Sequence, residues 1–178
     1  MRTLKYAILG LLAQQDMTGY ELMKQFESTL CEFWSAKHSQ IYPELKVLTE
    51  EGEVEYKIEI SGSVLEKKLY SITDAGKADF LNWLSKDVKI GPTPKNVFRL
   101  KVFFSNMLES ELRMHHLENQ LDQHEQRLAH LQENQQKFAS IPDSSSPEFG
   151  DYLVLMGAIM REETNCEWLK KCILLCRQ

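Results

Sequence analysis

The first 52 residues carry apolar side chains at the spacing of amphipathic helices. This pattern predicts one helix over residues 4–14 and a second over residues 18–30, which Thr18 would cap. A third helix is expected within residues 35–52, with its end at the glycine that follows two glutamates. The start of the chain is therefore expected to be a cluster of three helices.

A different periodicity follows these helices. Residues 53–60 alternate apolar and charged side chains with a period of two, and residues 64–72 have a similar strand character. A hairpin that turns at Ser61-Gly62-Ser63 is the expected structure. Thr73 and Asp74 then start a fourth helix. Three helices, a hairpin and one more helix, in this order, predict a winged helix-turn-helix.

The second half of the chain is predicted to be helical throughout. One glycine and two prolines within residues 91–94 mark a boundary. We therefore expect a first domain over residues 1–86, a linker over 87–94 and a helical domain over 95–178. The helices expected in that domain cover about 95–107, about 110–138 and 148–177.

Two of these helices carry apolar residues at alternating spacings of three and four, the heptad seam of a coiled coil. A seam needs a partner helix, and a two-helix arm with continuous seams and little other core is short of internal partners. We expect burial against a second copy of the protein, and hence a homodimer. The residues expected at the dimer interface are Leu117, Leu121, Leu128, Leu131, Leu155, Ile159, Leu169 and Ile173.

The predicted fold class is mainly α with a small β-hairpin: an N-terminal winged helix-turn-helix plus a C-terminal helical dimerisation domain. Composition agrees with a globular chain, with 43% apolar residues among 178. No apolar run approaches the roughly 20 residues of a membrane span, and the apolar N-terminal stretch is interpreted as a core helix. We expect a cytoplasmic protein whose four cysteines are reduced thiols.

A helix-turn-helix presents the start of its recognition helix to the major groove of DNA. A recognition helix that begins near His38 or Ser39 would place Pro43 close to the unpaired N–H groups of the first turn, where proline costs little. The first 86 residues have ten basic and thirteen acidic side chains, so the DNA-binding surface must be a local basic patch. The expected DNA-binding residues are Lys5, Lys37, His38, Ser39, Gln40, Tyr42, Lys46, Gly62, Lys67 and Lys68.

Four segments of the sequence, "LKYAILGLL", "TGYEL", "FWSAKHSQIYPELKVLTEEG" and "LEKKLYSITDAGK", resemble the winged-helix domain of the PadR family. "FWSAKHSQIYPEL" is similar to the phenolic-acid-responsive branch of that family, and "SSPEFGDYLVL" resembles the C-terminal dimerisation region of the same branch. The resemblance implies a homodimeric repressor that binds a palindromic operator. It also implies release from DNA by phenolic acids such as coumaric or ferulic acid.

A phenolic acid requires a flat apolar slot and a cation for its carboxylate. Both types of side chain occur just after the predicted linker. The candidate effector-binding residues are Phe98, Arg99, Lys101, Phe103, Tyr6 and Tyr152. Packing against other parts of the protein remains the alternative for any single one of these aromatic residues.

Other chemistry finds little support in the sequence. Four histidines within residues 115–130 lack a metal-binding pattern, no nucleotide-binding or nucleophile motif is present, and we expect no metal, no cofactor and no catalytic residue. Two alternative functions remain. One is a repressor of the same architecture that senses aromatic cations, and the other is a dimeric adaptor whose winged helix binds protein, which the net charge of −5 favours.

Overall fold

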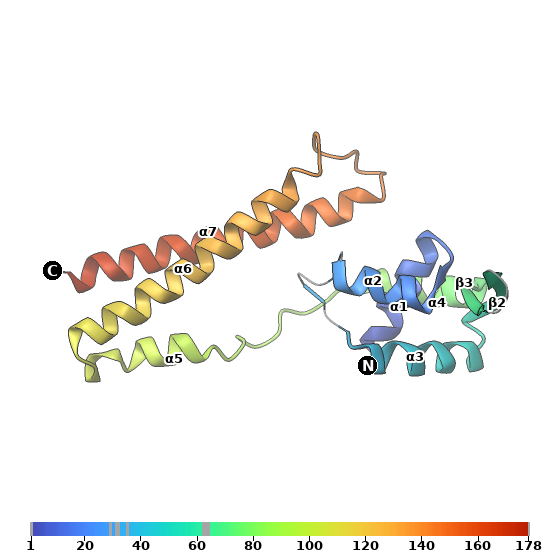
Figure 1. The fold of residues 1–178 in the computed structure, drawn as a ribbon, viewed down its shortest axis with the longest axis horizontal. Helices are drawn as coiled ribbons and strands as arrows, with labels where there is room; N and C mark the ends of the chain where they lie inside the picture. Colours follow the sequence, from blue (N-terminus) through green and yellow to red (C-terminus); the bar gives the residue numbers. More distant parts are fainter. Residues whose placement is uncertain (1, 29, 31–32, 35, 62–64, 178) are drawn as a thin grey trace. The chain divides into compact units, whose positions relative to one another are not determined.

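The computed structural model describes residues 2–28, 30, 33–34, 36–61 and 65–177, and the chain divides into two compact units, residues 1–90 and 91–178 (Figure 1). The order of elements in the first unit is α1 (Thr3–Gln14), β1 (Met17–Thr18), α2 (Gly19–Ser28), α3 (His38–Glu50), β2 (Val54–Ser61), β3 (Leu65–Ile72) and α4 (Asp74–Leu84). This is the predicted order of helices and hairpin, with one additional short strand.

The three strands form an antiparallel sheet in the order β1-β3-β2. Strands β2 and β3 pair continuously along the hairpin, beginning at its base with Val54 opposite Ile72. Strand β1 pairs with the other edge of β3 and places Met17 opposite Tyr70. Val54 is buried at the base of the hairpin, whereas Ile58 further along β2 is 58% exposed. Because only its base packs on the helices, the hairpin projects from the unit as a wing.

The core of the first unit lies between α1, α2, α3 and the base of the hairpin. Ile41, Leu45 and Leu48 are fully buried and form one face of α3. Their burial fixes the opposite face of α3 toward the outside of the unit. The other buried members of this core are Ile8, Leu9, Leu11, Leu12, Met17, Leu22, Phe26, Val54 and Tyr70.

Helix α3 begins at His38, as the sequence predicts, but Pro43 lies further inside the helix than expected. Pro43 is inside α3, beyond the residues whose N–H groups are unpaired. It therefore leaves the Ser39 carbonyl without its usual partner in the helix. Both Ser39 and Pro43 are exposed, so water can bind that carbonyl. Exposure, and not the position in the first turn, makes this proline tolerable.

The second unit contains α5 (Val97–Phe103), the short 3₁₀ helix η1 (Ser105–Met107), α6 (Ser110–Gln135) and α7 (Glu148–Cys176). Figure 1 shows α6 and α7 running side by side as a helical hairpin, with α5 beside the start of α6. The single helix predicted over about 95–107 is thus divided into α5 and η1. No helix among the described residues has the length and apolar character needed to cross a membrane.

The heptad seams of α6 and α7 pack against each other within one chain. Leu131 lies with Leu155 and Ile159 in one apolar cluster, and Leu117 lies with Leu169 and Ile173 in another. These six residues are buried without a second chain. Leu121 and Leu128 pack against the edges of the two clusters. The sequence-based argument that the seams lack internal partners is therefore corrected, because each seam is the partner of the other.

Candidate nucleic-acid interface

The polar residues predicted to contact DNA lie on the outer face of α3, opposite its buried leucines and isoleucine. This face displays Lys37, His38, Ser39, Gln40, Tyr42 and Lys46, all of which are exposed. The structure therefore brings these six predicted residues together, five of them on α3 and Lys37 directly before it. An exposed helix start with this composition has the donors and acceptors needed for base edges and phosphates.

Gln40 also has a structural role at the start of α3. Its side-chain Oε1 accepts a hydrogen bond of 3.0 Å from the backbone N–H of Lys37, the residue that precedes the helix. The amide oxygen of Gln40 is thus engaged in capping the helix. A bidentate contact with adenine uses both the oxygen and the nitrogen of the amide, so such a contact would require Gln40 to exchange its cap for the base.

Tyr42 lies against the first turn of α2. A Cβ atom on Gly19 would be only 2.6 Å from Tyr42 Cε1, so the aromatic ring rests directly on the glycine backbone. The His38 ring lies on α3 one turn away, with 4.8 Å between the two ring centroids. The absence of a side chain at Gly19 therefore allows α2 and α3 to approach closely and fixes the direction of Tyr42.

An open pocket with a volume of about 1290 Å³ lies between α2, α3 and the hairpin. It includes four of the predicted residues, Tyr42, Lys46, Lys67 and Lys68. Helix α2 and strand β2 contribute further aromatic and basic side chains, including Tyr20, Lys24 and Tyr56. This surface, together with the exposed start of α3, is called the basic groove below.

Two lysines of the basic groove lie over tyrosine rings. Lys68 Nζ is 4.0 Å from the centre of the Tyr56 ring, and Lys24 Nζ is 5.0 Å from that of Tyr20. Such cation–π contacts orient an ammonium group while leaving its hydrogens available to an anion. Sequence reasoning missed Tyr20, Lys24 and Tyr56. The spacing of four residues between Tyr20 and Lys24 on a predicted helix was the available signal for one of these pairs.

Acidic residues also line the basic groove and reduce its net charge. Glu21 accepts hydrogen bonds from the backbone N–H and hydroxyl of Thr18, and these bonds lower the pKa of the Glu21 carboxyl. Thr18 Oγ1 in turn accepts a hydrogen bond from the Glu21 backbone N–H, so Thr18 caps α2 as predicted. The negative charge of Glu21 is thus used in this reciprocal cap at the start of the helix. Glu59 faces Lys67 across the hairpin. Asp16 and Glu50 line the concavity as well, so its four lysines face four carboxylates, and the positive excess of the basic groove comes from Lys37 at the start of α3.

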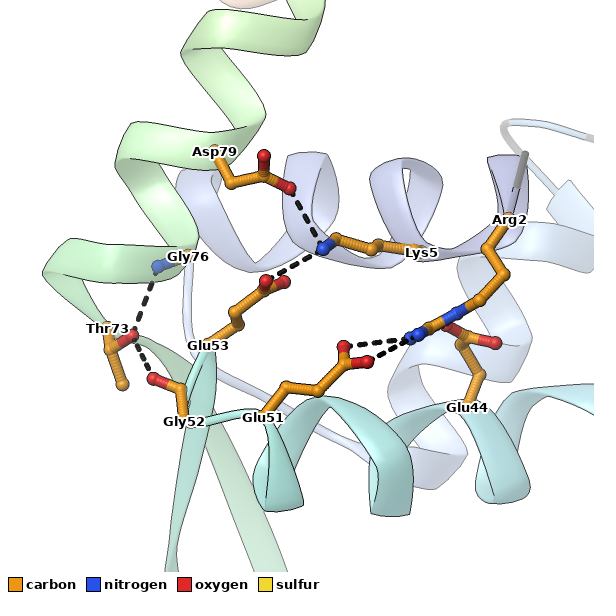
Figure 2. Close-up of polar contacts among 9 residues, drawn as sticks. All are labelled: Arg2, Lys5, Glu44, Glu51, Gly52, Glu53, Thr73, Gly76 and Asp79. Atoms are coloured by element: carbon orange, nitrogen blue, oxygen red, sulfur yellow. Dashed lines mark hydrogen bonds and ion pairs between the residues drawn. The ribbon is translucent and has the colours of Figure 1, made fainter.

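A set of ion pairs holds α3 against the start of the chain (Figure 2). The Arg2 guanidinium, at the start of α1, bonds to Glu44 at 2.7 Å and to Glu51 at 2.5 Å. Glu44 lies within α3 and Glu51 directly follows it. One cation therefore contacts the middle of α3 and the residue that follows its last turn, which fixes the direction of α3 relative to α1.

Lys5 lies in this supporting network and not in the basic groove. Its ammonium group is 2.7 Å from Glu53 Oε1 and 2.9 Å from Asp79 Oδ2, and its side chain is 13% exposed (Figure 2). Burial alone would lower the pKa of Lys5, but the hydrogen bonds to both carboxylates outweigh it and raise the pKa. The predicted DNA contact of Lys5 is corrected to a role in packing α1 against α4 and the start of β2.

Thr73 completes the frame. Its hydroxyl donates to the Gly52 carbonyl at 2.8 Å and accepts from the Gly76 N–H at 3.1 Å, so it joins the turn after α3 to the start of α4 (Figure 2). A Cβ atom on Gly76 would lie 2.1 Å from the Glu53 carbonyl oxygen. The glycine is required for this close approach of α4 to the turn. The remaining predicted DNA-binding residue, Gly62, lies outside the described residues.

The predicted effector-binding residues fall into separate places within their units. In the first unit, Tyr6 stacks on Trp83 with 4.5 Å between ring centroids. In the second unit, Arg99 lies over the Trp168 ring, which Phe98 meets edge-on.

The other three candidates also lie in the second unit. Tyr152 packs edge-on against Phe138, and the exposed Phe103 meets Phe104. Lys101, together with Phe98, lines a cavity of about 750 Å³ between α5, η1 and the start of α6. The candidates of the second unit therefore do not form one group. No cluster of three or more potential metal ligands occurs among the residues that the structure describes.

The sequence matches known families over both units. Residues 8–82 match the transcriptional regulator PadR-like family, and residues 94–177 match a family described as virulence activator alpha C-term. The chain is 42% identical over 178 residues to the negative transcriptional regulator PadR of Bacillus subtilis (strain 168), which covers 98% of each protein. The chain belongs to the PadR-like family of transcriptional regulators.

Solved structures of B. subtilis PadR have the same fold as this PadR-like chain. The complex of that protein with operator DNA gives a TM-score of 0.93 at 42% identity, covering 98% of this chain and 99% of the other. Its complex with p-coumaric acid gives a TM-score of 0.89 at 38% identity, covering 99% and 100%. These similarities confirm the predicted family and the predicted fold, a winged helix with a helical C-terminal region. They also confirm the prediction that the protein is a transcriptional regulator and not an enzyme.

Proposed function

We propose that this PadR-like protein is a homodimeric repressor that binds a palindromic operator and is released from it by an aromatic acid. The N-terminal unit would bind DNA through the exposed start of α3 and the wing. The C-terminal unit would hold two chains together and respond to the acid.

The basic groove is the observation that carries the proposal for DNA. It places lysines from α2, α3 and β3 around one concavity, next to the exposed polar start of α3. Lysines at such positions neutralise phosphates, while the polar start of the helix reaches base edges. B. subtilis PadR has been crystallised with operator DNA, and its fold matches this chain over nearly the whole length.

A gel-shift titration tests this part of the proposal. The DNA is the promoter region of the protein's own gene, with an unrelated promoter of equal length as the control. We expect a specific shift whose affinity falls steeply as salt rises, because phosphate contacts release counterions. Absence of any shift at low salt would overturn the repressor function and favour the protein-binding adaptor.

The dimer must use surfaces other than the seams, which are already buried within the chain. Helix α7 carries exposed apolar side chains on another face, among them Leu153, Val154, Met156 and Met160, and Met160 is 58% exposed. Exposed apolar residues at this density are typical of a surface that another chain covers. Sedimentation equilibrium should give twice the mass of the chain, and a monomer at micromolar concentration would contradict the proposal.

The proposed effector class is a phenolic acid such as p-coumaric or ferulic acid. B. subtilis PadR has been crystallised with p-coumaric acid, and that structure matches this chain over its whole length. Adding p-coumaric acid to the protein–DNA complex should release the DNA. A panel that includes cationic aromatic dyes separates this function from that of an aromatic-cation sensor.

One contact already disfavours the aromatic-cation sensor. Such a sensor would use a tryptophan at the dimer centre, and Trp168 was the residue available for this role in the C-terminal half. The guanidinium of Arg99 lies 5.7 Å from the centre of the Trp168 ring, so the ring has a cation of its own chain over it.

A regulator that binds operator DNA acts where the chromosome lies, and for this reason we propose the cytoplasm as its location.

A further inference from the structure

Ser39 and Pro43 lie at the centre of the exposed face of α3. Successive residues of an α-helix are about 100° apart, so each lies roughly 160° around the helix from the fully buried Ile41, in opposite directions. Both residues are exposed, and the longer side chains of Gln40 and Tyr42 flank them. Short side chains at the centre of this face allow the backbone of α3 to approach the floor of a groove closely.

The carbonyl of Ser39 is a hydrogen-bond acceptor that α3 itself does not use in the ordinary way. Its partner in a regular helix would be the N–H of residue 43, and Pro43 has no N–H. In the free protein, water can occupy this oxygen because both residues are exposed. A carbonyl only accepts, and the helix fixes its position, whereas the hydroxyl of Ser39 rotates and can both donate and accept.

The groups of DNA that can donate to such a carbonyl belong to the bases. Phosphate oxygens are acceptors and therefore repel it. In the major groove, the donors are the N6 amino group of adenine and the N4 amino group of cytosine, whereas guanine and thymine present acceptors at the corresponding positions. A fixed carbonyl at the groove floor thus favours adenine or cytosine on one strand and opposes guanine or thymine there.

We propose that the Ser39 main-chain carbonyl, left free by Pro43, accepts a hydrogen bond from the amino group of an adenine or a cytosine in each half-site of the operator. The inference rests on the proposed function, since it names a specificity-determining group within the DNA interface which that function requires. Ser39 makes the contact, and Pro43 acts through the N–H that it lacks. Pro43 is therefore a positioning residue, and its place inside α3 has a use in recognition.

Fluorescence anisotropy with the full-length protein tests the contact, using operator duplexes in which each base pair of the half-site is replaced in turn. At one position the wild type should prefer adenine or cytosine over guanine or thymine by about 5- to 10-fold. Pro43→Ala supplies an N–H for the Ser39 carbonyl and should lose the preference at that position alone. Because alanine favours a helix, this variant should unfold at a denaturant concentration at least as high as the wild type. Ser39→Ala keeps the carbonyl and should keep the preference.

A backbone ester separates the effect of the N–H from that of the proline ring. Lactic acid in place of residue 43 has the methyl group of alanine but no N–H, so this protein should show the wild-type preference. If the ester protein and Pro43→Ala lose the preference alike, the ring of Pro43 makes the contact and the inference is wrong. If Pro43→Ala keeps the preference, the carbonyl reads no base, while the proposed repressor function stands. A wild type that binds no operator would overturn the proposed function and this inference with it.

Discussion

His124 on α6 and Glu162 on α7 form a hydrogen-bonded pair inside the second unit, with His124 Nδ1 2.5 Å from Glu162 Oε2. Glu162 is only 3% exposed. Burial alone would raise the pKa of its carboxyl, but the hydrogen bond and charge of His124 outweigh it and hold the pKa below its usual value. Arg127 and Arg161 approach the other carboxylate oxygen at 3.7 Å. This polar layer lies between residues of the two apolar clusters of α6 and α7.

The pair predicts a loss of stability in acid. Because the pKa of Glu162 is lower in the folded state, its contribution is complete above the ordinary value of 4.5 and is lost as the pH falls through the folded value. Urea denaturation from about pH 3 to about pH 8 should show this loss in the wild type and a smaller one in Glu162→Gln. At neutral pH the variant should be less stable by about 1–3 kcal/mol.

Glu125→Gln is the matched control for this measurement. Glu125 pairs with Lys170 between the same two helices at 2.7 Å, but both side chains are exposed, so its replacement should change stability by less than about 1 kcal/mol. Equal losses in the two variants would show that burial of Glu162 has no special effect.

Lys5→Met should destabilise the first unit by about 3 kcal/mol, because it leaves Glu53 and Asp79 without their shared cation in a mostly buried place. Chemical denaturation measures the loss. Lys77→Met, an exposed lysine on α4, should remain within about 0.5 kcal/mol of the wild type. If Lys5→Met folds normally and only binds DNA more weakly, Lys5 contacts DNA after all.

Gly19→Ala should weaken operator binding by displacing Tyr42. The new methyl group would lie 2.6 Å from the ring, and the half-exposed ring can move aside at little cost in stability. We expect about a 10-fold loss of affinity in a gel shift. The double variant with Tyr42→Ala should bind like Tyr42→Ala alone. Additive effects of the two substitutions would show that Gly19 affects operator binding independently of the position of Tyr42.

Lys68→Met and Lys46→Met should each reduce the salt dependence of DNA binding. Each lost phosphate contact lowers the slope of log affinity against log salt by about 0.9. Both lysines line the basic groove, whereas Lys77 lies outside it and Lys77→Met should keep the wild-type slope. Fluorescence anisotropy at several salt concentrations measures these slopes, and three equal slopes would exclude the groove as the phosphate-binding surface.

Met160→Glu should raise the dissociation constant of the dimer by about 100-fold or more, because it places a charge on the exposed apolar face of α7. Leu131→Ala should instead lower the unfolding free energy by about 2–5 kcal/mol, since Leu131 is fully buried within the chain. Sedimentation equilibrium and denaturation separate the two effects. A dimer that withstands Met160→Glu must use another face.

Local chemistry made much of the first unit predictable. Thr18 and Thr73 cap the helices whose starts were predicted at these residues, and the alternation in residues 53–60 forms a strand that pairs antiparallel with β3, as the predicted hairpin requires. Strand β1 could not be predicted in the same way. It has two residues, too few for any period, and it exists because Met17 pairs with Tyr70.

Contacts between distant residues account for the errors. Nothing in the surroundings of Lys5 in the sequence indicates that Glu53, 48 residues away, accepts from its ammonium group. Likewise, a heptad period shows that α6 needs a partner but does not identify it, and α7 of the same chain fulfils the need.

Because Gln40 caps α3, its side chain must give up the cap before it can contact a base. The bond from Lys37 N–H to Gln40 Oε1 helps to hold the start of α3 in free protein, at a typical value of about 1 kcal/mol for a helix cap. A base pair that offers Gln40 an equivalent partner compensates for breaking it, whereas an unsuitable base pair does not. The same side chain would thus keep the helix ordered while the protein searches along DNA and would penalise arrest at a wrong sequence.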